Sequence, residues 1–261
     1  MSSRTLRLSG DELAYTLAQF GRPDIGHGVL QGMSDVPLAA EDAVQRILAA
    51  GHGLMARQLL QINAEATPVL ADDLQWIAGV LVQAPFSLRY SLTNAEATFN
   101  LTYHAANGGV VEHVVDQGVV HIFTQHEQPR AAVDGGLTFF QIAGLHSEIG
   151  SQGEITKALL DQAQEEQEVA AIQKILAQAT LTAPLREQFA EDLAQTSYRG
   201  SVMRVEYGPN GEPVADRGLL LLGGPARLWI LKPNQRPTGT VLTLIPGSES
   251  VFRREVSALM K

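Results

Sequence analysis

Residues 86–124 read FSLRYSLTNAEATFNLTYHAANGGVVEHVVDQGVVHIFT. Apolar and polar side chains alternate in this stretch with a period of two, which is typical of strands that bury one face. Asn107-Gly108-Gly109 is a hairpin signal, because glycine adopts the positive φ that tight hairpin turns need. Val110–Val115 and Val119–Thr124 are predicted as two further strands. The stretch therefore predicts an antiparallel β-meander.

Helical patterns precede this meander. Ser9, with Glu12 three residues later, has the spacing of a capping box and predicts the start of a helix. We expect turns from Gly21 to Leu38. A second helix is predicted from Glu41 to Asn63, and the glycines within it leave open a kink or two shorter helices. A third is predicted from Ala71 to Gln83.

The order of helices and strands then repeats. Leu137–Ile142 is a possible fifth strand of the first group. Helices are predicted over Glu154–Ala179, with a polar middle at Gln162–Glu168, and from Pro184 to Gln195. Ser248 is placed to cap a final helix. Four strands are predicted between the last two helical stretches, at residues 200–207, 214–222, 226–232 and 240–245.

Residues 41–143 and 154–245 thus read as two copies of one plan. Segregated runs of helices and strands favour an α+β fold over a parallel βαβ fold. We therefore expect an α+β protein with a pseudo-two-fold plan, in which helical bundles flank a central, largely antiparallel sheet. Gly208-Pro209-Asn210-Gly211 predicts a turn in the second copy. The chain is interpreted as one domain, 1–261, with internal halves of about 1–150 and 151–261.

Composition excludes several classes of function. The chain of 261 residues contains no cysteine, which excludes disulfides, thiolate metal sites and a cysteine nucleophile. A net charge of −9 argues against nucleic-acid binding. No apolar run reaches the roughly 20 residues that span a bilayer, and the opening MSSRTLRLSGDEL lacks an apolar signal core. We expect a cytoplasmic protein without membrane insertion.

Histidines are the main candidates for chemistry. Of the seven in the chain, His104, His113, His121 and His126 fall on neighbouring predicted strands. A zinc site needs three or four ligands that converge in space, and whether these side chains share a face depends on strand register. No acidic residue follows an HExxH-like spacing. A metal-binding or hydrolytic enzyme that uses this meander is therefore the alternative, while the main expectation is no metal, no cofactor and no catalytic residue.

The sequence also lacks a hydrolase signature. Gly247–Val251 reads GSESV, which follows a predicted strand and opens a helix but does not match the G-x-S-x-G pattern of a nucleophile elbow. Ser248 is better interpreted as an N-cap. Glu165, Glu166 and Glu168 are interpreted as a solvated helix face or a loop between helices.

The element order and several local patterns resemble the EspG family, the cytosolic chaperones of mycobacterial type VII (ESX) secretion. The stretches that carry the resemblance are Leu6–Leu13, Ala50–Leu54, Asp73–Ile77, Gly200–Val202, Gly223–Arg227 and Ile245–Gly247. The resemblance implies a pseudo-two-fold fold and a protein without enzymatic activity. It also implies a client such as a PE–PPE pair, held by the tip of the PPE protein, and it makes Arg227 the counterpart of an arginine in the family's third C-terminal block.

The expected function is that of a non-enzymatic chaperone or adaptor. Its partner would be a secreted helical protein, PE/PPE-like or of another kind, whose apolar tip aggregates unless it is covered. The candidate surface is Glu154–Gln195 with the adjoining strand edges. That this segment is only a solvated helix pair remains the alternative.

Overall fold

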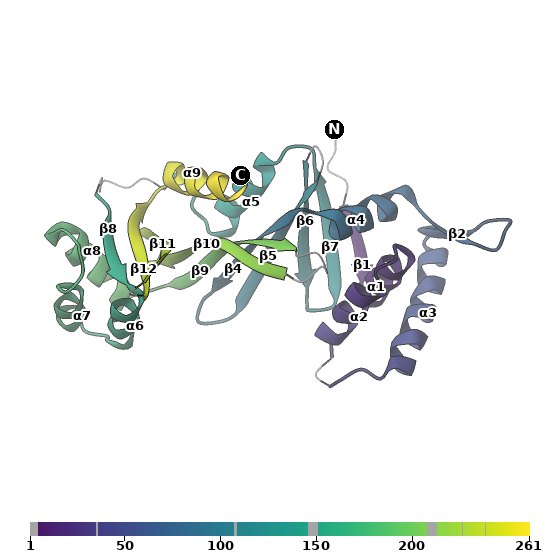
Figure 1. The fold of residues 1–261 in the computed structure, drawn as a ribbon, viewed down its shortest axis with the longest axis horizontal. Coiled ribbons are helices and arrows are strands. Elements are labelled where there is room, and N and C mark those ends of the chain that lie inside the picture. Colours follow the sequence, from purple (N-terminus) through teal and green to yellow (C-terminus); the bar gives the residue numbers. More distant parts are fainter. Residues whose placement is uncertain are drawn as a thin grey trace. The chain divides into compact units, whose positions relative to one another are not determined.

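The computed structural model describes residues 5–34, 36–106, 109–145, 151–207, 213–225, 227–237 and 239–261 (Figure 1). Its elements are, in chain order, β1 (Thr5–Ser9), α1 (Gly10–Gln19), α2 (Pro23–Gly32), α3 (Ala40–Ala56), β2 (Leu60–Ile62), β3 (Pro68–Leu70), α4 (Asp72–Gln83), β4 (Phe86–Thr93), β5 (Thr98–Ala106), β6 (Gly109–Asp116), β7 (Val120–His126), α5 (Arg130–Phe139), β8 (Gly153–Thr156), α6 (Lys157–Glu165), α7 (Val169–Leu176), α8 (Ala183–Ala194), β9 (Tyr198–Tyr207), β10 (Pro213–Gly223), β11 (Leu228–Arg236), β12 (Gly239–Gly247) and α9 (Glu249–Leu259). None of the described helices is long and apolar enough to cross a membrane.

Ten strands join one sheet in the order β1-β7-β6-β5-β4-β9-β10-β11-β12-β8, and β2 pairs with β3 in a separate hairpin. The strand pairs are antiparallel. One plan occurs twice along the chain: a short strand (β1 or β8), helices, a four-stranded meander and a closing helix (α5 or α9). In both copies the short strand pairs with the last strand of its own meander. The predicted α+β class and pseudo-two-fold plan are confirmed.

The chain forms two compact units, residues 1–87 with 101–129 and residues 88–100 with 130–261. In the first unit, apolar side chains of α1, α3 and α4 are buried together with side chains of β1, β6 and β7. Leu13, Leu54 and Leu74 come from the helices, and Val111 and Phe123 come from the strands. These helices therefore cover one face of this part of the sheet.

The capping box at the start of α1 is present as predicted. The Oγ of Ser9 accepts a hydrogen bond from the backbone N–H of Glu12 at 3.1 Å, and Oε2 of Glu12 accepts one from the backbone N–H of Ser9 at 2.9 Å. Arg57, at the end of α3, donates to the same Oε2 at 2.7 Å. The cap therefore both starts α1 and connects it to α3.

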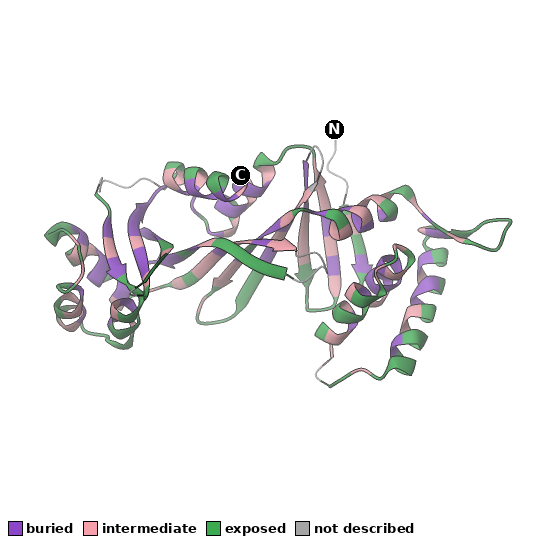
Figure 2. Cartoon of the chain, in the orientation of Figure 1, coloured by how far each residue is buried: buried purple, intermediate pink, exposed green. Residues whose placement is uncertain are grey.

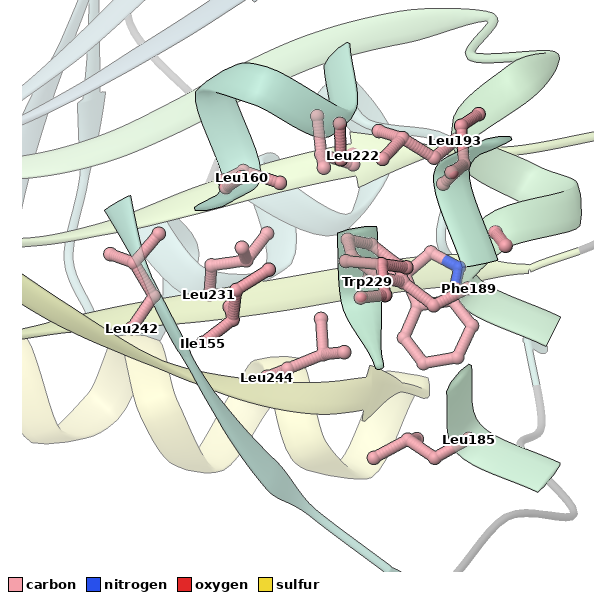
Figure 3. Close-up of a cluster of buried hydrophobic side chains, with 14 residues drawn as sticks. Ile155, Leu160, Leu185, Phe189, Leu193, Leu222, Trp229, Leu231, Leu242 and Leu244 are labelled. Atoms are coloured by element: carbon pink, nitrogen blue, oxygen red, sulfur yellow. The ribbon is translucent and has the colours of Figure 1, made fainter. Parts of the chain in front are cut away.

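The second unit has a core between α6–α8 and one face of β8 and β10–β12 (Figure 3). Trp229 and Phe189 lie at its centre, with ring centroids 5.1 Å apart in an edge-to-face arrangement. Figure 2 shows β12 as largely buried, whereas the β2–β3 hairpin of the first unit is largely exposed. The fully packed members of this core are Ile155, Leu160, Ala163, Ile172, Leu176, Leu185, Phe189, Ala190, Leu193, Leu222, Trp229, Leu231, Leu242 and Leu244.

Two predictions in the N-terminal region are wrong. The expected turns contain α2, whose Pro23 occupies the first helical turn, where its missing N–H costs nothing. Gly26 lets α2 approach α1 closely, because a Cβ there would lie 2.7 Å from the carbonyl oxygen of Ala14. The helix predicted to reach Asn63 ends at Ala56. Gln58 has a φ of 59°, which breaks the helix, and the following residues form β2.

Two later predictions also need correction. Leu137–Ile142, predicted as a strand, forms no strand: residues 137–139 are the last residues of α5, whose buried face includes Val133 and Leu137, and residues 140–142 follow the helix as a turn. The helix predicted from Glu154 begins as β8, since Ile155 pairs with Leu242 of β12. The remainder divides into α6 and α7 at the polar residues 166–168. The predicted turns at Asn107-Gly108 and at 208–211 lie outside the described residues.

Candidate functional site

Three of the four candidate histidines lie side by side on one face of the sheet in the first unit. The ring of His113 stacks between His104 and His121, with centroid separations of 5.7 and 5.1 Å. Nε2 of His113 and Nδ1 of His121 are 2.9 Å apart and share one hydrogen bond. The register places these rings on the same face as Val111 and Phe123. The rings therefore contribute to the packing beneath the helices.

His126 lies on the opposite face of the sheet. Its Nε2 is 3.1 Å from Oε2 of Glu112, which also accepts a hydrogen bond of 2.7 Å from the hydroxyl of Tyr103. Within the described parts of the chain, no three His, Asp or Glu side chains are arranged to hold a metal ion. The geometry thus brings three of the sequence candidates together and separates the fourth. Among the described residues it offers no ligand set for the metal-site alternative.

Burial of the histidine stack makes the stability of the first unit dependent on pH. His121 is 7% exposed, and this burial lowers the pKa of its imidazole. The unfolded chain, with an ordinary histidine pKa of about 6.5, then binds a proton that the folded chain excludes. The contribution of His121 to the free energy of unfolding is therefore fully present above the pKa of the unfolded chain and is lost progressively as the pH falls below that value.

We expect the free energy of unfolding, measured by urea denaturation, to fall between about pH 7 and pH 5. A His121→Leu variant should lose part of that dependence. The exposed His27 serves as a control, since a His27→Gln variant should follow the wild-type profile. Equal pH profiles for wild type and His121→Leu would contradict this account.

Ser248 has the structural role that its sequence context predicts. Its Oγ accepts a hydrogen bond from the backbone N–H of Val251 at 3.3 Å, which caps α9. The same oxygen is 3.0 Å from the hydroxyl of Ser250. These contacts account for a serine at the start of a helix.

A buried carboxylate that the sequence analysis missed lies beneath Arg227. Asp192, on α8, is 2% exposed, and its Oδ2 accepts hydrogen bonds from Nε1 of Trp229 at 2.9 Å and from Nη1 of Arg227 at 3.0 Å. Glu191 lies 3.5 Å from the same guanidinium nitrogen. The spacing of Asp192 after Leu185 and Phe189 places it on the apolar face of α8, and this position was the signal that could have revealed it.

Arg227 lines a pocket of about 480 Å³ in the second unit. Its apolar side chains include Phe140, Ile142 and Leu228. Tyr198 adds a hydroxyl that donates to the carbonyl oxygen of Phe140 at 3.4 Å, and burial raises its pKa to about 12, which keeps it protonated. Asn94, Gln141 and Ser197 also line the pocket, so its lining is mixed and does not single out an apolar ligand.

The candidate surface of Glu154–Gln195 consists of β8 and the three helices α6–α8. Thr156 caps α6 through a hydrogen bond of 3.3 Å from the backbone N–H of Leu159. The helix ends at Glu165, and the next three residues have no regular structure. Glu165, Glu166 and Glu168 are all exposed. The polar interruption is therefore a solvent-facing acidic corner between two short helices.

Comparison with solved structures supports the expected fold. The chain superposes on the type VII secretion chaperone EspG5 of Mycobacterium tuberculosis, solved in complex with a PE25–PPE41 dimer, with a TM-score of 0.66. The match covers 98% of this chain and 96% of EspG5 at 12% sequence identity. At that identity the likeness shows a shared fold. No curated protein sequence matches the chain.

A family model, in contrast, matches the sequence itself. The match spans residues 36–244, which include most of both copies of the structural plan. Because this range is well over half of the chain, the protein belongs to the family described as uncharacterised protein YfjC.

Proposed function

We propose that this protein is a non-enzymatic chaperone or adaptor that acts in the cytoplasm on a secreted helical protein. The observation that carries the proposal is the end-to-end likeness to a chaperone that was solved with its bound PE25–PPE41 dimer. A fold can host unrelated functions, so the proposal also needs a surface on which a client would be held.

The proposed client surface is the α6–α8 layer with the edge strand β8. Apolar side chains on the inner side of this layer are used in the core of the second unit, so its outer, polar side is the part available to a client. The exposed Glu165, Glu166 and Glu168 favour a client with basic residues beside its apolar tip. Charges at the edge of an interface steer encounter and select partners more than they add affinity.

The test is affinity capture from native cells with wild-type protein and with Glu165→Lys/Glu166→Lys/Glu168→Lys. We expect wild type to recover a secreted helical protein, and the triple variant to bind it about tenfold more weakly or worse. Binding of the purified pair by calorimetry gives the magnitude, and its dependence on salt reports the electrostatic part.

A charge-matched control separates local from global effects. Glu96, Asp116 and Glu127 are exposed and lie outside the α6–α8 layer, so their triple replacement by lysine changes net charge equally and should leave binding intact. Failure of wild type to recover any secreted protein would remove the proposed function. Equal binding by both triple variants would be compatible with the proposed function but would show that the client binds to a different surface.

A further inference from the structure

The strands β1 and β8 are the two ends of the ten-stranded sheet, so each has an outer edge with no further strand beside it. Such an edge presents backbone N–H and C=O groups that can pair with another chain. At β8 the outer edge is closed by backbone, because Glu154 exchanges two hydrogen bonds of 3.0 Å with Thr180. At β1 the outer edge is met by side chains instead.

The backbone groups of β1 alternate between its two edges. Gly10, directly after β1, donates its N–H at 3.2 Å to the carbonyl oxygen of Val119, directly before β7. Residues two apart in an extended strand direct their N–H and C=O groups to the same side. The even-numbered residues of β1 therefore point toward β7, and the groups of Thr5, Arg7 and Ser9 point to the outer edge.

Two paired side chains bind these outward groups. Nη2 of Arg57 donates to the carbonyl oxygen of Arg7 at 2.7 Å, and Oε2 of Glu12 accepts from the N–H of Ser9 at 2.9 Å. Nη1 of Arg57 and Oε2 of Glu12 are themselves 2.7 Å apart. In a parallel sheet, one residue of a neighbouring strand donates to the C=O of residue i and accepts from the N–H of residue i+2. The ion pair therefore fills the place of one residue of an added strand.

We propose that the Arg57–Glu12 pair closes the outer edge of β1 and thereby prevents β1 from pairing with β1 of a second copy of this chain. The edge is self-complementary, because a two-fold axis beside Leu6 places Thr5 of each copy opposite Arg7 of the other. Outward-pointing residues that lie opposite one another in an antiparallel pair exchange two hydrogen bonds. Each Arg7 carbonyl would then accept from a Thr5 N–H, and Arg57 already donates to it.

The two members of the pair have different roles. The side chain of Glu12 is 11% exposed and belongs to the capping box of α1, whereas that of Arg57 is 41% exposed. Arg57 is the C-cap residue of α3, and Gln58 follows it with a φ of 59°, so the end of the helix holds the guanidinium at the edge. An ion pair this exposed adds little to stability. Replacing Arg57 should therefore change association more than folding.

The first test measures mass against concentration by sedimentation equilibrium. Arg57→Ala should associate at least tenfold more strongly than wild type, because the Arg7 carbonyl is uncovered. Arg57→Met keeps the apolar stem without the donors and should behave in the same way, even if Arg57→Ala folds poorly. Arg46→Ala is the matched control, since Arg46 also joins α3 to the first turn of α1, through Asp11 at 2.8 Å, and should associate as wild type does. Equal association of wild type and both Arg57 variants would overturn the proposal.

The second test asks whether the added association uses the backbone of β1. Proline has no N–H and is tolerated in an edge strand where that N–H faces outward. Arg7→Pro therefore leaves the pairing of β1 with β7 intact and removes a donor from the outer edge. The double variant Arg57→Met/Arg7→Pro should return to the weak association of wild type. If it still associates as strongly as Arg57→Met, the contact lies elsewhere and the proposal is wrong.

Discussion

Replacing Trp229 with alanine is expected to lower the free energy of unfolding by about 3–5 kcal/mol. Trp229 is 1% exposed and lies in the core of the second unit against Phe189. Its removal leaves a large cavity between α8 and the sheet. It also withdraws the N–H that pairs with the buried Asp192, so a carboxylate loses one of its partners. Urea denaturation followed by circular dichroism measures the effect without depending on tryptophan fluorescence.

A smaller change at the same position separates packing from hydrogen bonding. Trp229→Phe retains an aromatic ring but lacks the indole N–H. We expect it to cost about 1–3 kcal/mol, as for a buried polar group that loses a partner, with some loss of packing added. The partly buried Trp76 is the comparison site, and Trp76→Ala should cost less than Trp229→Ala. The opposite order would show that the core of the second unit is less tightly packed than described.

The second large effect is expected at Phe252, on α9. Phe252 is completely buried, and its ring meets Phe140 edge-to-face with centroids 6.0 Å apart. Phe252→Ala should cost about 3–5 kcal/mol, because the cavity forms where α9 packs beside α5 and neither helix can collapse into it without moving the other. Thermal and urea unfolding both report this loss.

Phe99→Ala is the control for Phe252→Ala. Phe99 belongs to the same unit but is 49% exposed, so its removal opens no cavity and should change stability by about 0.5 kcal/mol or less. A comparable loss in both variants would contradict the assignment of Phe252 to the core.

Local signals in the sequence predicted most of the elements. Ser9 and Ser248 mark helix starts because a side-chain oxygen at the cap satisfies free N–H groups wherever the helix then packs. The prediction of a strand at Leu137–Ile142 was wrong because tertiary contacts decide the structure there. A short apolar run suits a strand or a helix equally, and contacts of α5 within the second unit decide for the helix.

The candidate surfaces were less predictable than the elements. Val44, Ile47, Leu48 and Leu54 belong to one apolar pattern in the sequence, yet Leu54 is buried while Val44 and Leu48 face outward. Periodicity locates apolar residues on a helix but does not say which side has a partner. Asp192 was missed for a related reason. Its carboxylate can be buried only because Trp229 and Arg227 donate hydrogen bonds to it, and these two residues lie more than 30 positions later in the sequence.

Pairing of β1 with β7 also affects the order in which the protein can fold during synthesis. Leu8 lies opposite His121, and Ile155 of β8 lies opposite Leu242 of β12. At a translation rate of roughly 5–20 residues per second, the 113 residues from Leu8 to His121 take about 6–23 s to synthesise, so β1 is made that long before its partner strand. During that interval the leucines of β1 cannot be buried against β7. Pairing of the two strands must then also offset the conformational entropy lost when the long intervening loop closes. In each copy, the strand that pairs with the last strand of the meander is therefore synthesised well before the meander itself.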